Sequence, residues 1–182
     1  MRYAMLAMFT PALLLAACQT DEIERSPIGA TAPSTSLAAS VLPISGQCEG
    51  TFDFIPIDFL PPPQDDLAAH ARLPFRGTCR VSHLGKSVTV GEDLVDFTGD
   101  PFVGTGTRVF IAADGSELRM SEDVATPGPG ENPAFTSTGT FTFTGGTGRF
   151  QSASGTARFS GGGSIADFTN YLEFEGTLTL AE

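Results

Sequence analysis

Basic side chains are scarce in this chain, and lysine is the scarcest of them. Ten lysine and arginine residues face twenty-one aspartates and glutamates, and Lys86 is the only lysine. No cluster of basic residues occurs along the sequence, which excludes the charged surface that binds nucleic acid. The formal net charge of −11 is typical of a solvated, repulsive surface.

Sequence signatures of catalysis and of metal binding are also missing. The chain has no GxSxG, HExxH or kinase-like pattern. Its three cysteines contain no CxxC spacing and its two histidines, His70 and His83, are not clustered, so we expect no zinc site. We expect no metal and no cofactor. An acidic group without the spacing of an EF-hand loop is formed by Glu92, Asp93, Asp96 and Asp100.

The first seventeen residues are typical of an export signal. Arg2 is followed by an apolar run that is too short to span a bilayer as a mature helix, and Pro11 would break a buried helix. The end of the run, LAAC at 15–18, resembles the lipobox of bacterial lipoproteins. The resemblance implies that Cys18 carries diacylglycerol and palmitate-type acyl chains, which hold the protein on a membrane. Gln19, in place of aspartate, favours the outer membrane.

The remaining cysteines, Cys48 and Cys79, can pair in the oxidising envelope. Such a disulfide closes about thirty residues and would stabilise the fold by roughly 3–4 kcal/mol. Two unpaired buried thiols are the alternative. Residues 18–44 are rich in Ser, Thr, Ala and Pro without hydrophobic periodicity, which predicts a disordered tether. The folded domain is expected to span 45–182.

From residue 49 onward the hydrophobic period is two, which predicts strands. Residues 134–144 place three phenylalanines on one face, and 170–180 alternate in the same way with Leu and Phe. Pro56 demotes the segment around it to an edge or bulged strand. Leu84-Gly85 and Asp114-Gly115 predict hairpins, and 60–66 and 126–133 predict longer loops.

Seven or eight short strands without an amphipathic helix predict an all-β domain, either a sandwich or a small antiparallel barrel. Fifteen phenylalanines, one of them within the signal, suit the filling of a small barrel, whereas the absence of tryptophan argues against a lipocalin.

The segment GGTGRF at 145–150 first suggests a phosphate loop. A phosphate loop needs a helix after the glycines and usually a lysine, and here another strand pattern follows instead. We therefore interpret Gly145, Gly146 and Gly148 as a chain reversal. Phe150 is then expected to fold back onto the core, and Arg149 to lie across the end of the barrel.

GGTGRF, followed by Ala153 and Gly155, resembles a segment of the allene oxide cyclase and dirigent barrels and of uncharacterised bacterial exported proteins. SHLGK at 82–86 and AADGSEL at 112–118 are similar to pieces of those bacterial proteins. The resemblance covers roughly 70–180. It implies an eight-stranded antiparallel barrel of the calycin type with an apolar interior that is able to hold a small ligand. The plant activities do not transfer, because the shared turn is a signature of fold.

His83 is a weak catalytic candidate, since a neighbouring Glu92 or Asp93 would give a pair for acid–base chemistry. A structural role in the turn is the alternative, and His70 is expected to be exposed. The function predicted is a lipid-anchored envelope barrel, without catalysis, that binds a small apolar or amphipathic ligand or a protein partner. The alternatives are a cyclase or isomerase that uses the barrel mouth, and a structural or adhesive homo-oligomer.

Overall fold

The computed structural model describes residues 39–128 and 134–181. The expected export signal, the lipidation site Cys18, residues 18–38 of the expected tether and most of the loop at 126–133 lie outside the described residues. In the described part of the chain, no helix is both long and apolar enough to cross a membrane.

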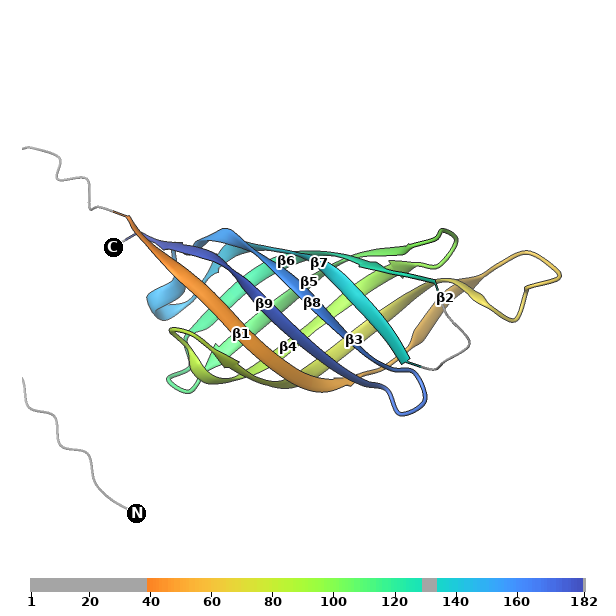
Figure 1. The fold of residues 1–182 in the computed structure, drawn as a ribbon, viewed down its shortest axis with the longest axis horizontal. Coiled ribbons are helices and arrows are strands. Elements are labelled where there is room, and N and C mark those ends of the chain that lie inside the picture. Colours follow the sequence, from red (N-terminus) through yellow and green to blue (C-terminus); the bar gives the residue numbers. More distant parts are fainter. Residues whose placement is uncertain (1–38, 129–133, 182) are drawn as a thin grey trace, which may run out of the picture. The chain divides into compact units, whose positions relative to one another are not determined.

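Within residues 39–128 and 134–181, nine antiparallel strands form one sheet, and eight of them close into a barrel, because β1 pairs with both β9 and β3 (Figure 1). The predicted all-β domain is thereby confirmed, as a barrel and not a sandwich. The elements are β1 (Ser40–Phe52), β2 (Ile55–Phe59), β3 (Ala68–Val81), β4 (Gly85–Asp96), β5 (Phe102–Ala112), β6 (Glu117–Thr126), β7 (Ala134–Gly146), the short 3₁₀ helix η1 (Gly148–Phe150), β8 (Ser154–Ser164) and β9 (Thr169–Leu180).

The first strand begins at Ser40, earlier than the domain start expected near Ser45. Residues 40–44 pair with the last part of β9, and the Ile44 side chain is only 1% exposed. Burial of one isoleucine and a continuous ladder of hydrogen bonds therefore outweigh the Ser- and Pro-rich composition, which had favoured a tether here.

The strand around Pro56 is an edge strand, as predicted. β2 pairs only with β3, and its register shifts twice, between Pro56 and Asp58 and between Asp58 and Phe59. A proline and bulges at an open edge disfavour pairing with another chain. Because β2 continues the direction of β1 along β3, the hairpin β2–β3 projects beyond one end of the barrel (Figure 1).

The barrel has two different ends. At the plugged end lie the turns 82–84 and 113–116 and the segment 147–153, whereas the cavity end carries 60–67, 97–101 and 165–168. Both predicted hairpins are present at the plugged end. Gly85 and Gly115 adopt φ values of +73° and +82° in them, a conformation that favours glycine.

The GGTGRF segment closes the plugged end. After Gly145 and Gly148, at φ +108° and +57°, the chain turns through η1, and the Phe150 side chain is completely buried. Arg149 forms an ion pair with Asp114 and donates a hydrogen bond of 3.1 Å to the carbonyl of His83. The segment reverses the chain, as interpreted from the sequence, because β7 before it and β8 after it pair antiparallel. Arg149 also connects it to the other two turns at this end.

Phenylalanine rings fill the half of the barrel next to this plug. The Phe110 and Phe174 rings stack with centroids 5.4 Å apart, and the Phe141 ring stacks on Phe159 at 4.6 Å. The Phe174 ring lies on Gly46, its direct partner on β1, where an added Cβ would come within 2.6 Å of the ring. Glycine on one strand thus makes space for a phenylalanine on the next.

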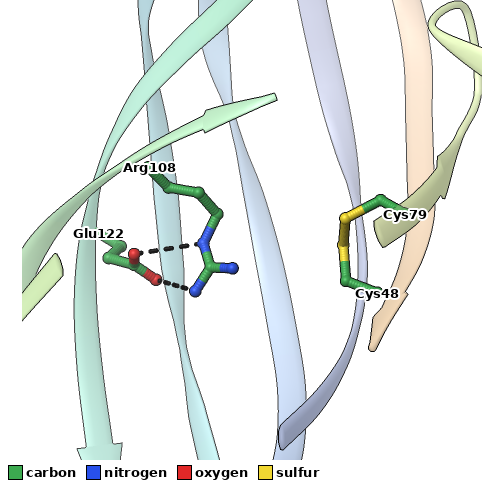
Figure 2. Close-up of a disulfide and its surroundings, with 4 residues drawn as sticks. All are labelled: Cys48, Cys79, Arg108 and Glu122. Carbon is green, nitrogen blue, oxygen red and sulfur yellow. Dashed lines mark hydrogen bonds and ion pairs between the residues drawn. A yellow bond between two sulfur atoms is a disulfide. The ribbon is translucent and has the colours of Figure 1, made fainter. Parts of the chain in front are cut away.

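A disulfide joins Cys48 on β1 to Cys79 on β3, and both side chains are buried (Figure 2). The two residues are direct partners in the β1–β3 ladder, the pairing that closes the barrel. The bond therefore fastens the seam of the barrel across a sequence separation of 31 residues.

Replacing both residues, Cys48→Ala and Cys79→Ala, is expected to lower the free energy of unfolding by about 3 kcal/mol, because the unfolded chain regains the freedom of the opened loop. Urea unfolding of the oxidised proteins measures the difference. Dithiothreitol should lower the midpoint of the wild-type protein and leave that of the double variant unchanged. Equal midpoints for the oxidised wild-type protein and the double variant would contradict the expectation.

Candidate functional site

Three charged residues point into the barrel from three adjacent strands. They are Asp93 on β4, Arg108 on β5 and Glu122 on β6. Asp93 and Glu122 are the two direct cross-strand neighbours of Gly106, one on each side. A Cβ on Gly106 would lie 2.0 Å from the Asp93 Oδ1 atom. The missing side chain therefore allows the two carboxyl groups to share the space above the glycine.

Arg108 and Glu122 form a buried bidentate ion pair (Figure 2). Arg108 Nε and Nη2 each donate a hydrogen bond of 3.2 Å to the Glu122 carboxylate, and the two side chains are 7% and 1% exposed. The guanidinium carbon lies 3.9 Å from the centroid of the Phe75 ring. That ring in turn covers Gly91, so β3 and β4 together provide an aromatic support for the cation.

Asp93 has a carboxyl group with one buried oxygen, Oδ1, that lacks a hydrogen-bond partner within the described residues. Burial raises the pKa of Asp93 to about 8, and the Glu122 carboxylate adds to this effect through its charge and through a hydrogen bond with Asp93, while Arg108 opposes it. At neutral pH Asp93 is therefore mostly protonated, and Glu122 remains the counterion of Arg108.

These groups form the floor of a partly enclosed cavity of about 100 Å³ that lies toward the cavity end of the barrel. Polar groups near its rim include Ser137 and Asn170. Ser87 and Thr89, on the same inner face of β4, also have unpartnered hydroxyls, but neither lines the cavity. Apolar walls are supplied by Phe52, Phe75, Phe135, Phe159 and Leu172.

A larger concavity, of about 1030 Å³, is an open groove on the outside of the barrel. Side chains of both signs line it, and Gln47 donates a hydrogen bond of 3.0 Å to Glu173 within it. Its charged side chains are exposed to solvent. Hydrogen bonds and interactions between charges contribute less binding energy in a solvated groove than in a desolvated cavity. The interior cavity is therefore the better candidate for a binding site.

His83, the catalytic candidate from the sequence, does not meet the expected carboxylates. It is exposed in the β3–β4 turn at φ +65°, and its Nε2 atom lies 2.8 Å from the carbonyl oxygen of Pro43. Glu92 pairs instead with Arg72, and Asp93 lies inside the barrel. The expected proximity is wrong, because seven or more residues of extended β4 separate Glu92 and Asp93 from the turn.

The other histidine is the one that meets carboxylates. The Nδ1 atom of His70 lies 2.8 Å from Asp58 Oδ1, and its Nε2 atom lies 3.8 Å from Asp96 Oδ1. These residues form one row across β2, β3 and β4 on the outer face, so they fasten the edge strand and do not face the cavity.

The acidic group expected around residues 92–100 is dispersed over the inner and outer faces of the barrel. Within the described ranges, no group of three or more His, Cys, Asp or Glu side chains is placed to hold a metal. From the sequence alone, Asp93 is indicated only as a possible neighbour of His83 and as a member of this acidic group, and Arg108 and Glu122 are not among the candidates. Known protein families, curated proteins and solved structures were all compared with this chain, and none matches it.

Proposed function

We propose that this barrel binds a small amphipathic molecule in its interior cavity, without catalysis. The observation that carries the proposal is the position of Asp93, which lines the floor of a cavity with phenylalanine walls and has one buried oxygen without a hydrogen-bond partner within the described residues. Small-molecule sites combine largely apolar walls with a few convergent polar groups in this way. A volume of about 100 Å³ admits a small molecule, or one end of a longer molecule that continues toward the rim.

The proposal is tested by titrating the ¹⁵N-labelled protein with n-butanol, butyrate and n-butylamine, three probes of nearly equal size. At least one probe is expected to cause saturable changes in amide shifts confined to residues at the cavity. Ser137→Leu fills part of the cavity, and it should weaken binding at least tenfold. The matched control is Thr138→Leu, which adds the same side chain on the exposed face of the same strand.

Binding of none of the three probes would overturn the proposal. So would shifts that persist in Ser137→Leu, since they would come from another surface. A folded Ser137→Leu variant, shown by dispersed amide signals, is needed for the comparison, and Thr138→Leu should bind the probe as the wild-type protein does.

We also infer that the barrel is lipid-anchored at Cys18 to the bacterial outer membrane. The support is the signal-like run at 1–17, the LAAC sequence and Gln19. The mass of the amino-terminal peptide from the membrane fraction tests this inference: acylated Cys18 supports it, and an unmodified terminus overturns it. The similarity of GGTGRF to the allene oxide cyclase and dirigent barrels remains a resemblance of one turn. In this barrel the turn reverses the chain between β7 and β8.

The cyclase or isomerase hypothesis depended on His83, which does not line the cavity. His83 lies in a turn at the plugged end, whereas the cavity lies toward the other end of the barrel. A structural or adhesive homo-oligomer has no specific observation in its favour among the described residues. The binding function is therefore preferred to both.

A further inference from the structure

We propose that the cavity takes the ammonium group of a small primary amine, held between Asp93 and Glu122, with the stem of the amine along the phenylalanine walls. The inference rests on the proposed function and names the chemical class of its ligand.

The charges at the floor of the cavity favour a cation. Two carboxyl groups face one guanidinium, and Glu122 already accepts both hydrogen bonds from Arg108. When all three groups are ionised, the floor carries one negative charge in excess. A bound monovalent cation restores neutrality, which a buried site strongly favours. A carboxylate ligand would instead add to the excess of negative charge, because Arg108 is already paired with Glu122.

The hydrogen-bonding groups at the floor also suit an ammonium group. Asp93 Oδ1 offers an acceptor that nothing in the described barrel uses. An ammonium group has three donors and no acceptor, and each oxygen of a carboxylate can accept two hydrogen bonds. The ammonium group can therefore donate hydrogen bonds to Asp93 and, at the same time, to the remaining acceptor positions of Glu122. A hydroxyl group has only one hydrogen to donate, so it satisfies the floor less completely.

The aromatic walls of the cavity suit both the ammonium group and the stem of an amine. Phe75 already supports one cation, the Arg108 guanidinium, and Phe52, Phe135 and Phe159 line the same cavity. Aromatic faces attract cations, most strongly where water is excluded, and they also cover an alkyl or aromatic stem. The cavity volume of about 100 Å³ limits the buried part to a few heavy atoms. The geometry thus fits a short amine and excludes a quaternary ammonium group with bulky substituents.

Protonation of Asp93 gives the inference a second readout. The charged groups around Asp93 are Glu122 on β6, Arg108 on β5 and Glu92 beside it on β4, while β3 presents Leu73 as its direct partner. With a pKa of about 8, Asp93 holds a proton that an incoming ammonium displaces. Binding should therefore release one proton at pH 6.5, and the affinity should rise about tenfold per pH unit up to pH 8 and then level off.

The experiment is isothermal titration calorimetry of the full chain with n-butylamine, n-butanol and butyrate, in two buffers of different ionisation enthalpy at pH 6.5 and 7.5. We expect n-butylamine to bind at least tenfold more tightly than n-butanol at pH 7.5, and butyrate to bind most weakly. Asp93→Asn should weaken n-butylamine binding at least tenfold and abolish the proton release. Asp123→Asn, which removes an exposed carboxylate from the outer face of β6, is the matched control and should bind n-butylamine as the wild-type protein does.

The outcomes separate the two proposals. If n-butanol or butyrate binds in the cavity and n-butylamine binds no more tightly, the amine proposal fails and the small-molecule function stands. If no probe binds, both fail. Amine binding that persists in Ser137→Leu, or that survives Asp93→Asn undiminished, places the ammonium elsewhere and overturns the inference.

Discussion

The Asp93→Asn variant is expected to keep its stability between pH 5 and pH 8, while the wild-type protein loses about 4 kcal/mol over the same range. The pKa of Asp93 is about 8 in the folded barrel, against an ordinary value of 3.8. Between these values the folded state holds a proton that the unfolded chain has released, so stability falls by about 1.4 kcal/mol for each pH unit. Above pH 8 both states are ionised and the loss ends.

Other shifted carboxyl groups act in a different pH range. Hydrogen bonds and ion pairs lower the pKa values of four exposed groups, so their stabilising effect is present above their unfolded pKa values and is lost only as the solution becomes strongly acidic. They therefore do not change stability between pH 5 and pH 8. The groups are Glu92, Asp96, Asp114 and Asp167.

Urea unfolding at pH 5, 6, 7 and 8 measures this prediction, with the difference between variant and wild type as the quantity of interest. The acidic surface is common to both proteins, so taking the difference removes its effect on the free energy of unfolding. Asp123→Asn is again the control, since its carboxylate is exposed, and its stability should follow that of the wild-type protein. Parallel curves for Asp93→Asn and wild type would show that Asp93 is ionised throughout, contrary to the assigned pKa.

The double variant Asp93→Asn with Glu122→Gln is expected to lose about 3–5 kcal/mol at pH 7, more than the two single variants together. In Glu122→Gln, the main neighbouring charge that raises the pKa of Asp93 is gone, and Arg108 continues to lower it. Asp93 can then ionise and become the counterion of Arg108. In Asp93→Asn, Glu122 keeps its ion pair. Only the double variant leaves a buried guanidinium without a carboxylate.

A double-mutant cycle measures this coupling, because the residues share one network and their effects are not additive. The triple variant that also carries Arg108→Met tests the cause. Methionine covers a similar volume without charge, so the triple variant should regain much of the stability that the double variant lost. Additive single effects, or no recovery on removing Arg108, would contradict the account of the three residues as one charge-balanced group.

Much of the fold could be predicted from the sequence, because the relevant signals are local. The alternation in β7 and β9, the Asp114-Gly115 hairpin and the bulged edge at Pro56 each depend on a few adjacent residues. The start of β1 differs from the expectation because its order comes from pairing with β9, more than a hundred residues away. The composition of residues 40–44 alone does not indicate that they pair with a distant strand.

The candidate site was harder to predict, although a signal for it exists. Arg108 alternates with the buried Phe110, and Glu122 alternates with the buried Met120, so strict periodicity places two opposite charges on the inner face of one hairpin. Asp93 is different. Its raised pKa depends first on burial and then on Glu122 and Arg108, which reach it only through the β4–β5–β6 register around Gly106.

From the pairing of the first strand with the last, we expect the barrel to close late in folding. Ser40 pairs with Leu180, whereas β3 to β9 follow one another through neighbouring pairs. Sequential hairpins close short loops, but the β1–β9 contact must bring together the two ends of the domain, which slows its formation. Until β9 has joined, β8 and β1 expose open edges that can pair with other chains. A chain truncated before Thr169 would keep those edges, so aggregation is the expected fate of incomplete molecules.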